Sequence, residues 1–191
     1  MYLWHMKLPL IAFLSIWMWV AQAQSGAVIS VGYSSGFTDY SLATANGGFM
    51  SGWNAGIVGR FGDGKFFIRP GLELHKIYLE SANKAELFTD RKSAYFLKIP
   101  AQIGYRIINL EKFKLIAMGG VQVSYIWSIQ ENALGLNHDT MKDFQLGALF
   151  GGGIDLGPLV FCVQFEKGLS ELYTGTSKKS DYVIYTLGFS F

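Results

Sequence analysis

The chain has 191 residues, of which 50% are hydrophobic, 16% aromatic and 16% charged, and its formal net charge is +2. This length suits one domain, and the composition excludes both a disordered polymer and a nucleic-acid-binding protein, because the few basic residues are spread along the chain. The single cysteine excludes an internal disulfide and a cysteine-built metal site, while the 23 glycines, all after residue 23, suggest a tightly built all-β protein.

The first 23 residues predict a cleavable signal peptide. Lys7 precedes an apolar run from Leu8 to Val20, and Ala21-Gln22-Ala23 matches a cleavage site. The run is shorter than the roughly 20 residues of a membrane-spanning helix, so an uncleaved anchor is the less favoured alternative. We therefore expect an exported chain with one domain, residues 24–191.

Eight segments of this domain alternate between two kinds of side chain, with the period of two that predicts β-strands. In chain order they are 27–34, 53–61, 65–75, 95–106, 114–127, 143–155, 159–166 and 182–191. One face of every segment carries no Asp, Glu, Lys or Arg. The other face holds all the strand charges and most of the strand glycines.

The connections between these segments alternate in length. Tight turns are expected at 61–64, 108–113 and 156–158. Longer polar links separate the other neighbours, at 35–49, 81–91, 131–141 and 169–180. This regular alternation predicts an antiparallel up-and-down barrel with turns at one rim and loops at the other.

The alternation alone does not say which face points inward. A soluble periplasmic ligand-binding barrel would bury the charge-free face, whereas an outer-membrane barrel would turn it toward lipid. Three features favour the membrane barrel. The polar face is rich in glycine, which fits a narrow lumen; the strands are long enough to cross a bilayer; and the last strand alternates. It is also favoured by aromatic residues near the strand ends, predicted to lie at the lipid interface: Phe61, Phe66, Tyr95, Tyr105, Trp127, Phe144 and Phe191. We predict an all-β, eight-stranded transmembrane barrel.

Three stretches resemble known outer-membrane proteins. Residues 182–191 are similar to the assembly signal of Gram-negative outer-membrane barrels. The apolar positions of that signal are Tyr185, Leu187, Phe189 and Phe191. The stretch 95–105, with its Ile-Pro and Gly-Tyr pairs, and the stretch 67–72 resemble strands of the PorT-like family of outer-membrane β-barrels. The resemblance implies an outer-membrane location and insertion by the barrel-assembly machinery, but no particular task, because the family shares function poorly.

Two prolines lie inside predicted strands. Pro70 and Pro100 each remove a donor from the strand ladder, which normally indicates an edge strand. Since a closed barrel has no edge, we expect local bulges or bends at both positions.

The polar face predicts a luminal network. With both termini in the periplasm, Glu73, Lys98 and Glu166 reach similar heights, and Arg69 lies lower, beside Gln102. Buried charges of both signs are expected to pair. We predict contacts among these four charges, with the remaining donors satisfied by Gln122, Gln145 and Gln164. The favoured interpretation is packing that excludes water, and the alternative is a gated polar path.

Other residues offer chemistry less clearly. His75 shares the luminal face with Glu73, which allows acid–base catalysis but more often means a simple hydrogen bond. His138-Asp139 supplies too few ligands for a metal site, and no cofactor is expected. A rim hydrolase or acyltransferase would have suitable residue types, without a distinctive spacing, in Ser170-Glu171, Ser177, Ser180-Asp181 and His138.

Two further features have structural interpretations. Gly151-Gly152-Gly153 lacks the strand–loop–helix context of a phosphate-binding loop, so we interpret it as a site of strand bending or close approach. Cys162 is expected to be a small luminal filler.

The outer links carry apolar residues that could bind a partner or pack as a cap over the barrel. These residues are Phe37, Tyr40, Leu87, Phe88, Leu134, Leu136, Leu172 and Tyr173. The favoured function is a non-enzymatic, closed outer-membrane barrel whose loops contact an unknown surface or secretion partner, or which supports envelope assembly. The expected partners are therefore outer-membrane lipid, the barrel-assembly machinery and that surface partner, with no nucleic acid.

Overall fold

The protein is described here by a computed structural model covering residues 25–36, 51–78, 92–131, 137–172 and 179–191. The strands are β1 (Ser25–Gly36), β2 (Ser51–Phe61), β3 (Phe66–Tyr78), β4 (Ser93–Asn109), β5 (Phe113–Ile129), β6 (Phe144–Leu156), β7 (Leu159–Gly168) and β8 (Asp181–Ser190). Within the described ranges, no helix is long and apolar enough to span a membrane. The predicted signal peptide lies outside these residues.

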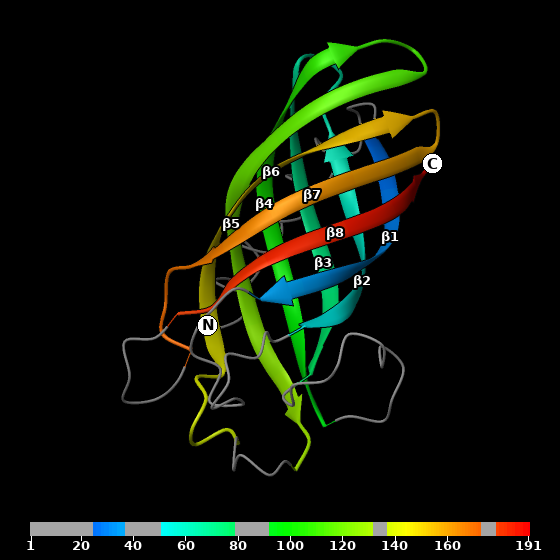
Figure 1. Ribbon diagram of the computed structural model, residues 1–191. Coiled ribbons are helices and arrows are strands. Elements are labelled where there is room, and N and C mark those ends of the chain that lie inside the picture. The colour runs from blue at the N-terminus through cyan, green and yellow to red at the C-terminus, as the bar shows by residue number, and fades with distance from the viewer. Residues whose placement is uncertain (1–24, 37–50, 79–91, 132–136, 173–178) are drawn as a thin grey trace, which may run out of the picture.

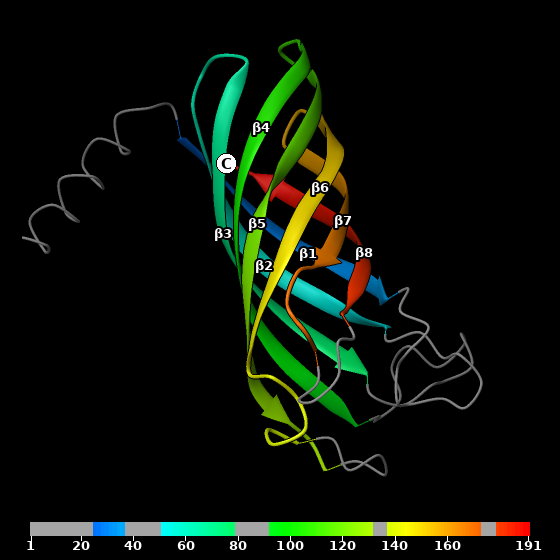
Figure 2. The same ribbon diagram turned by 90° about the vertical axis from the view of Figure 1, so that its left-hand side faces the viewer.

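The eight strands form one closed antiparallel barrel in the order of the chain (Figure 1). Each strand pairs with its sequence neighbour, and β1 closes the barrel on β8, with Val31 opposite Leu187. The strands tilt against the barrel axis, as two views at right angles show (Figures 1 and 2). The predicted eight-stranded up-and-down barrel is confirmed.

The two ends of the barrel differ as the link lengths predict. At the turn end, in the upper part of Figure 1, Gly62 and Gly157 adopt φ angles of 130° and 58°, a left-handed backbone that favours glycine. The β4–β5 turn lies at the same end. The strand ends that face the long links form the opposite rim, which we call the loop end.

The charge-free face points outward. Mid-strand residues such as Val31, Ile103 and Val121 are 55–62% exposed, whereas the luminal Arg69 and Lys98 are 1% and 2% exposed. An apolar belt around the whole cylinder is far larger than the patches that soluble monomers expose. The soluble-barrel alternative is therefore wrong, and the predicted sidedness is confirmed.

The outward face is not free of charge along its whole height. The strands extend further toward the loop end than the sequence pattern indicated, and they bring Lys76, Lys167 and Asp181 onto that face. Lys167 Nζ lies 2.5 Å from Asp181 Oδ2. Charges become tolerable at this height because the strands rise there from hydrocarbon toward the headgroups.

Both strand prolines are accommodated without the expected bulges. The β3–β4 register keeps one offset from Phe66 to Tyr78, and the β4–β5 register shifts lie at Tyr95/Phe96 and Arg106/Ile108, away from Pro100. Instead, pairing is omitted beside the prolines. β2 and β3 form no pairs between Val58↔Gly71 and Phe61↔Ile68, and β3 and β4 form none between Pro70↔Ala101 and Glu73↔Lys98. The missing N–H of each proline thus coincides with a position where the strand ladder is not paired.

Candidate functional site in the lumen

The loop end of the lumen is closed by an apolar cluster. We call this the loop-side cluster, and its buried members are Ile77, Ala94, Phe96, Ile126, Met141, Leu172, Tyr182 and Ile184. Met141 and Leu172 come from segments that follow β5 and β7, so connecting residues as well as strands fill the opening. Of the predicted apolar link residues, Leu172 is the one within the described ranges, and its burial fits a cap.

A polar layer lies next to this cluster, on its turn-end side. Lys98 Nζ on β4 is 2.6 Å from Glu166 Oε2 on β7, and both side chains are at least 95% buried. The same ammonium lies 4.9 Å from the centre of the Tyr182 ring. The cation thus has a carboxylate partner and an aromatic face, as a buried charge requires.

A second hydrogen-bonded chain crosses the same layer from β2 through β1 to β3. Asn54 Nδ2 donates to Ser34 Oγ over 3.1 Å, Ser34 Oγ lies 3.2 Å from His75 Nδ1, and His75 Nε2 lies 3.0 Å from a Glu73 carboxylate oxygen. With Glu73 ionised, the His75 Nε2–H donates to it and the neutral Nδ1 accepts the Ser34 proton.

This serine–histidine–carboxylate order is that of a hydrolase triad. Ser34 and His75 are, however, 1% and 0% exposed. No substrate can reach a nucleophile buried to that degree in a closed barrel. The arrangement satisfies buried polar groups and does not form an open active site.

Nearer the turn end, a second apolar cluster fills the lumen. This turn-side cluster consists of Val28, Val58, Phe67, Ile116, Met118, Val160 and Cys162. Its largest ring, Phe67, lies against Gly104: a Cβ at that glycine would be 2.0 Å from the ring. Gly104 is the direct cross-strand neighbour of Phe67, and its lack of a side chain allows the ring to lie over β4. On the loop-end side of this ring, Arg69 Nη1 donates to Gln102 Oε1.

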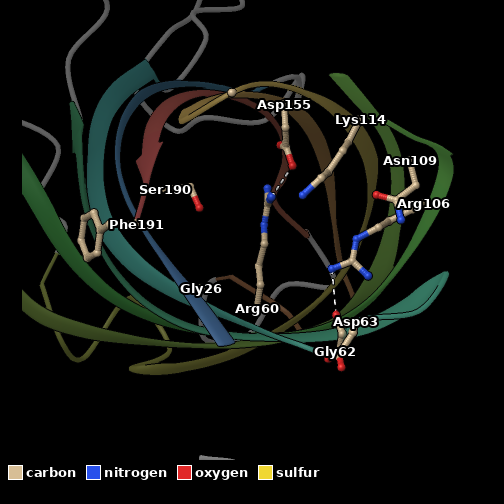
Figure 3. Close-up of a pocket in the computed structure, with 11 residues that line it drawn as sticks. Gly26, Arg60, Gly62, Asp63, Arg106, Asn109, Lys114, Asp155, Ser190 and Phe191 are labelled. Atoms are coloured by element: carbon tan, nitrogen blue, oxygen red, sulfur yellow. Dashed lines mark hydrogen bonds and ion pairs between the residues drawn. The ribbon is translucent and has the colours of Figure 1, made fainter. Parts of the chain in front are cut away.

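The turn-end mouth carries a third group of charges, outside the predicted network (Figure 3). Arg60 on β2 reaches across the lumen to β6, where its Nη1 lies 2.5 Å from Asp155 Oδ2. Arg106 on β4 donates to the carbonyl oxygens of Gly62 and Gly64 in the β2–β3 turn. Both guanidinium groups lie over the Phe67 ring, at 5.7 and 4.7 Å from its centre.

The predicted luminal residues all lie inside the barrel, but their contacts differ from the predicted network. Lys98 pairs with Glu166 as expected, whereas Glu73 pairs with His75 rather than with Arg69 or Lys98. Arg69 forms no ion pair among the described residues.

The glutamines do not bridge the charges either. Gln122 donates to Ser124 Oγ, and Gln145 donates to the carbonyl of Lys142. Gln164 Nε2 has no partner within the described part of the protein. The physical reason is side-chain length. The glutamine amides bond to residues near them in the chain, whereas the longer Lys98 side chain on β4 extends through the lumen to Glu166 on β7.

The rim residues considered for catalysis or metal binding are dispersed. His138 pairs with Asp143 rather than with Asp139, and Ser170 Oγ accepts a hydrogen bond from the Leu146 backbone. Ser177 lies outside the described residues, and Ser180 is buried. The described ranges contain no group of three or more His, Cys, Asp or Glu residues that could hold a metal.

The predicted interface aromatics are placed on the outward face. Phe66, Trp127, Phe144 and Phe191 are 65–68% exposed. Tyr105 and Phe66 pack together with ring centres 4.9 Å apart, and Phe61 and Tyr95 are half-buried. Their role at the lipid interface stays a prediction.

Sequence reasoning missed the Arg60–Asp155 pair. Both residues are on the luminal face, and each directly precedes the last strand residue before a tight turn, 61–64 and 156–158. That shared distance from the turn end, with opposite charges, was the signal that could have identified them. Ser34 and Asn54 had no such signal, because neutral polar residues leave many partners open.

These layers define a class: a closed transmembrane β-barrel with an apolar exterior and side chains packed in its lumen. The comparisons with known proteins agree. A family model described as "Outer membrane protein beta-barrel domain" matches residues 20–174, so the chain belongs to this family and the protein lies in the outer membrane. No curated protein matches the chain significantly.

Solved structures of similar fold are small outer-membrane proteins. Neisserial surface protein A has 10% identity and a TM-score of 0.50, covering 87% of this chain and 97% of that one. OprG from Pseudomonas aeruginosa has 11% identity and a TM-score of 0.48, covering 88% and 97%. Ail from Yersinia pestis has 12% identity and a TM-score of 0.45, covering 87% and 99%. At these identities the likeness concerns the fold alone.

Proposed function

We propose that this protein is a sealed, non-enzymatic outer-membrane barrel that acts by contact with a partner at the cell surface, through the links at its loop end. The observation that supports the proposal is the filled lumen. Two apolar clusters enclose a layer of paired charges, which leaves no continuous polar path for a solute. The long links are the remaining part of the molecule that an external partner could reach.

Conductance tests the sealed lumen. The full chain is reconstituted in planar bilayers beside an open porin as the positive control. We expect no steady openings, because opening would require both apolar clusters to disperse. Steady, large openings would contradict the sealed lumen and favour transport as the function.

Cell attachment tests the contact function. Residues 37–50 and 79–91 are each replaced by a short Asn-Gly turn, and intact cells are compared for mutual aggregation and for attachment to polystyrene. We expect both to fall several-fold toward the level of cells lacking the protein. The control carries Glu111→Ser and Lys112→Ser in the turn-end β4–β5 turn, and should behave as the natural chain.

The natural chain must itself raise attachment above the level of cells lacking it, otherwise the contact function fails. The rival function, support of envelope assembly, has its own expected result. In that case loss of the whole protein sensitises cells to detergent, and both link-shortened variants restore resistance.

We also propose that the chain belongs to the PorT-like branch of outer-membrane barrels and that the barrel-assembly machinery recognises β8. The Ile-Pro pair at Ile99-Pro100 in β4 and the Pro-Gly pair at Pro70-Gly71 in β3 support the branch. A solved PorT-like barrel should show the same omitted pairing beside both prolines. A register shift at those prolines would count against the assignment.

A further inference from the structure

A polar cavity of about 510 Å³ opens at the turn end of the barrel (Figure 3). The residues that line it include Arg60, Asp63, Arg106, Asn109, Lys114 and Asp155. Cavities of a few hundred Å³ are the size that small ligands occupy. In outer-membrane barrels the short turns face the periplasm, so this cavity is open to periplasmic molecules and not to the cell surface.

The cavity contains more positive than negative side chains. Arg60, Arg106 and Lys114 contribute three cations, and Asp63 and Asp155 contribute two carboxylates. Arg60 uses one nitrogen for Asp155, while its Nε and Nη2 have no hydrogen-bond partner among the described residues. The side chain of Lys114 has neither a hydrogen bond nor an ion pair within the same ranges, and in Figure 3 it extends toward the Arg60–Asp155 pair.

Two of the cations are already held in place. Arg60 is held by Asp155 and by the Phe67 ring, and Arg106 is held by two turn carbonyls and by the same ring. A ligand therefore does not have to order these side chains, which removes part of the entropic cost of binding. The Phe67 ring that both guanidinium groups contact belongs to the buried turn-side cluster.

We propose that this cavity binds the carboxylate of a periplasmic molecule, either a free organic acid or the end of a peptide. The net charge of the five side chains is +1, which favours an anion with a single charge. A phosphate dianion would bring a second charge near Asp155 and Asp63, with no cation left to balance it. Lys114 is the ligand's direct partner, and Arg60 and Arg106 supply the surrounding positive potential.

An NMR titration of the full chain in detergent micelles tests this proposal. The probes are N-acetylglycine, its uncharged amide, inorganic phosphate, and a neutral tetrapeptide with either a free or an amidated C-terminus. We expect saturable shifts of the amides of Asn109, Lys114 and Gly157 with the free carboxylates and none with the amides. Tighter binding of N-acetylglycine or of the tetrapeptide identifies the source of the carboxylate.

Two neighbouring lysines provide a matched pair of variants. Lys114→Met removes the proposed partner and should weaken binding about tenfold or more, as the loss of a charge-assisted contact predicts. Lys112→Met makes the same charge change two residues away, on an exposed turn residue that does not line the cavity, and should leave affinity within twofold. Arg106→Gln provides a second test: it keeps hydrogen-bonding capacity but removes one of the three cations, and it should also weaken binding.

Equal losses of affinity in Lys114→Met and Lys112→Met would mean that the net charge of the protein alone attracts the ligand, and would overturn the proposed site. Saturation by the amides, or tighter binding of phosphate than of the carboxylates, would overturn the ligand class. Heat-modifiable migration on gels confirms that each variant is folded before its affinity is compared.

Discussion

Lys98 and Glu166 show how a narrow lumen holds charge. Their side chains are 3% and 5% exposed and 2.6 Å apart, so neither is hydrated and each depends on the other. Burying such a pair brings little net stability, but removing one partner leaves an uncompensated charge in a medium of low dielectric constant. Single and paired substitutions should therefore differ sharply.

We expect Lys98→Met to lower the free energy of unfolding by about 3–5 kcal/mol, and the double variant Lys98→Met/Glu166→Leu to recover most of that loss. Urea unfolding in phospholipid vesicles, followed by tryptophan fluorescence, measures both. The control is Lys142→Met, which breaks the exposed pair with Glu171 and should cost less than about 1 kcal/mol. If Lys98→Met is as mild as the control, the pair is hydrated and the lumen is open.

Ser34 tests the absence of catalysis. Ser34→Ala removes the hydroxyl between Asn54 and His75, and leaves two buried polar groups without a partner, which should cost about 1–3 kcal/mol. Ser30→Ala, a buried luminal serine without a hydrogen bond among the described side chains, should cost less. A fluorophosphonate probe, which reacts with activated serines, should not label the natural chain. Labelling that disappears in Ser34→Ala would contradict a non-enzymatic function.

At this scale the sequence predicted faces better than partners. Alternation assigns each side chain to the lumen or the exterior because successive Cβ atoms in a strand point to opposite sides. Partners depend on strand stagger and side-chain length, which alternation does not contain. Arg69 was therefore assigned to a carboxylate although it bonds to Gln102, its direct cross-strand neighbour.

At the scale of whole elements, the sequence predicted which strands exist better than it predicted where they begin and end. All eight were predicted, yet β4 and β5 are each 17 residues long and exceed their predicted segments at both ends. The pattern fades there because strands that have left the hydrocarbon do not need an apolar outward face, as Lys76 and Lys167 illustrate. Strand bounds were thus the least predictable part of the fold.

The next prediction concerns the last strand, β8, and its recognition by the barrel-assembly machinery. Phe189 and Phe191 are outward-facing at the turn end, with ring centres 6.4 Å apart. We expect Phe189→Ala/Phe191→Ala to reduce the folded, heat-modifiable fraction in cells several-fold while leaving refolding of purified protein into vesicles within twofold. Such a split would separate recognition by the assembly machinery from stability. Phe144→Ala/Phe150→Ala removes two comparably exposed rings from β6, and equal effects in cells would contradict a signal specific to β8.

For the whole molecule, the outward belt is apolar in mid-strand and charged toward the loop end, so the membrane should act most strongly on the middle of the barrel. Val121 lies midway along β5 and is 55% exposed. Tyr95 lies opposite Lys76, at the height where charges are already present. The same substitution at these two depths therefore measures where the hydrocarbon lies.

We expect Val121→Arg to lower the free energy of unfolding in phospholipid vesicles by about 2–4 kcal/mol, because an arginine at the midplane must leave water for hydrocarbon. Tyr95→Arg should cost about 0–1 kcal/mol through charge, in addition to its lost ring contacts, which Tyr95→Ala measures separately. In detergent micelles, where water reaches the belt more easily, the difference between the two depths should shrink. Equal costs at both depths in vesicles would place the membrane elsewhere on the cylinder and contradict the assignment of the loop-end rim.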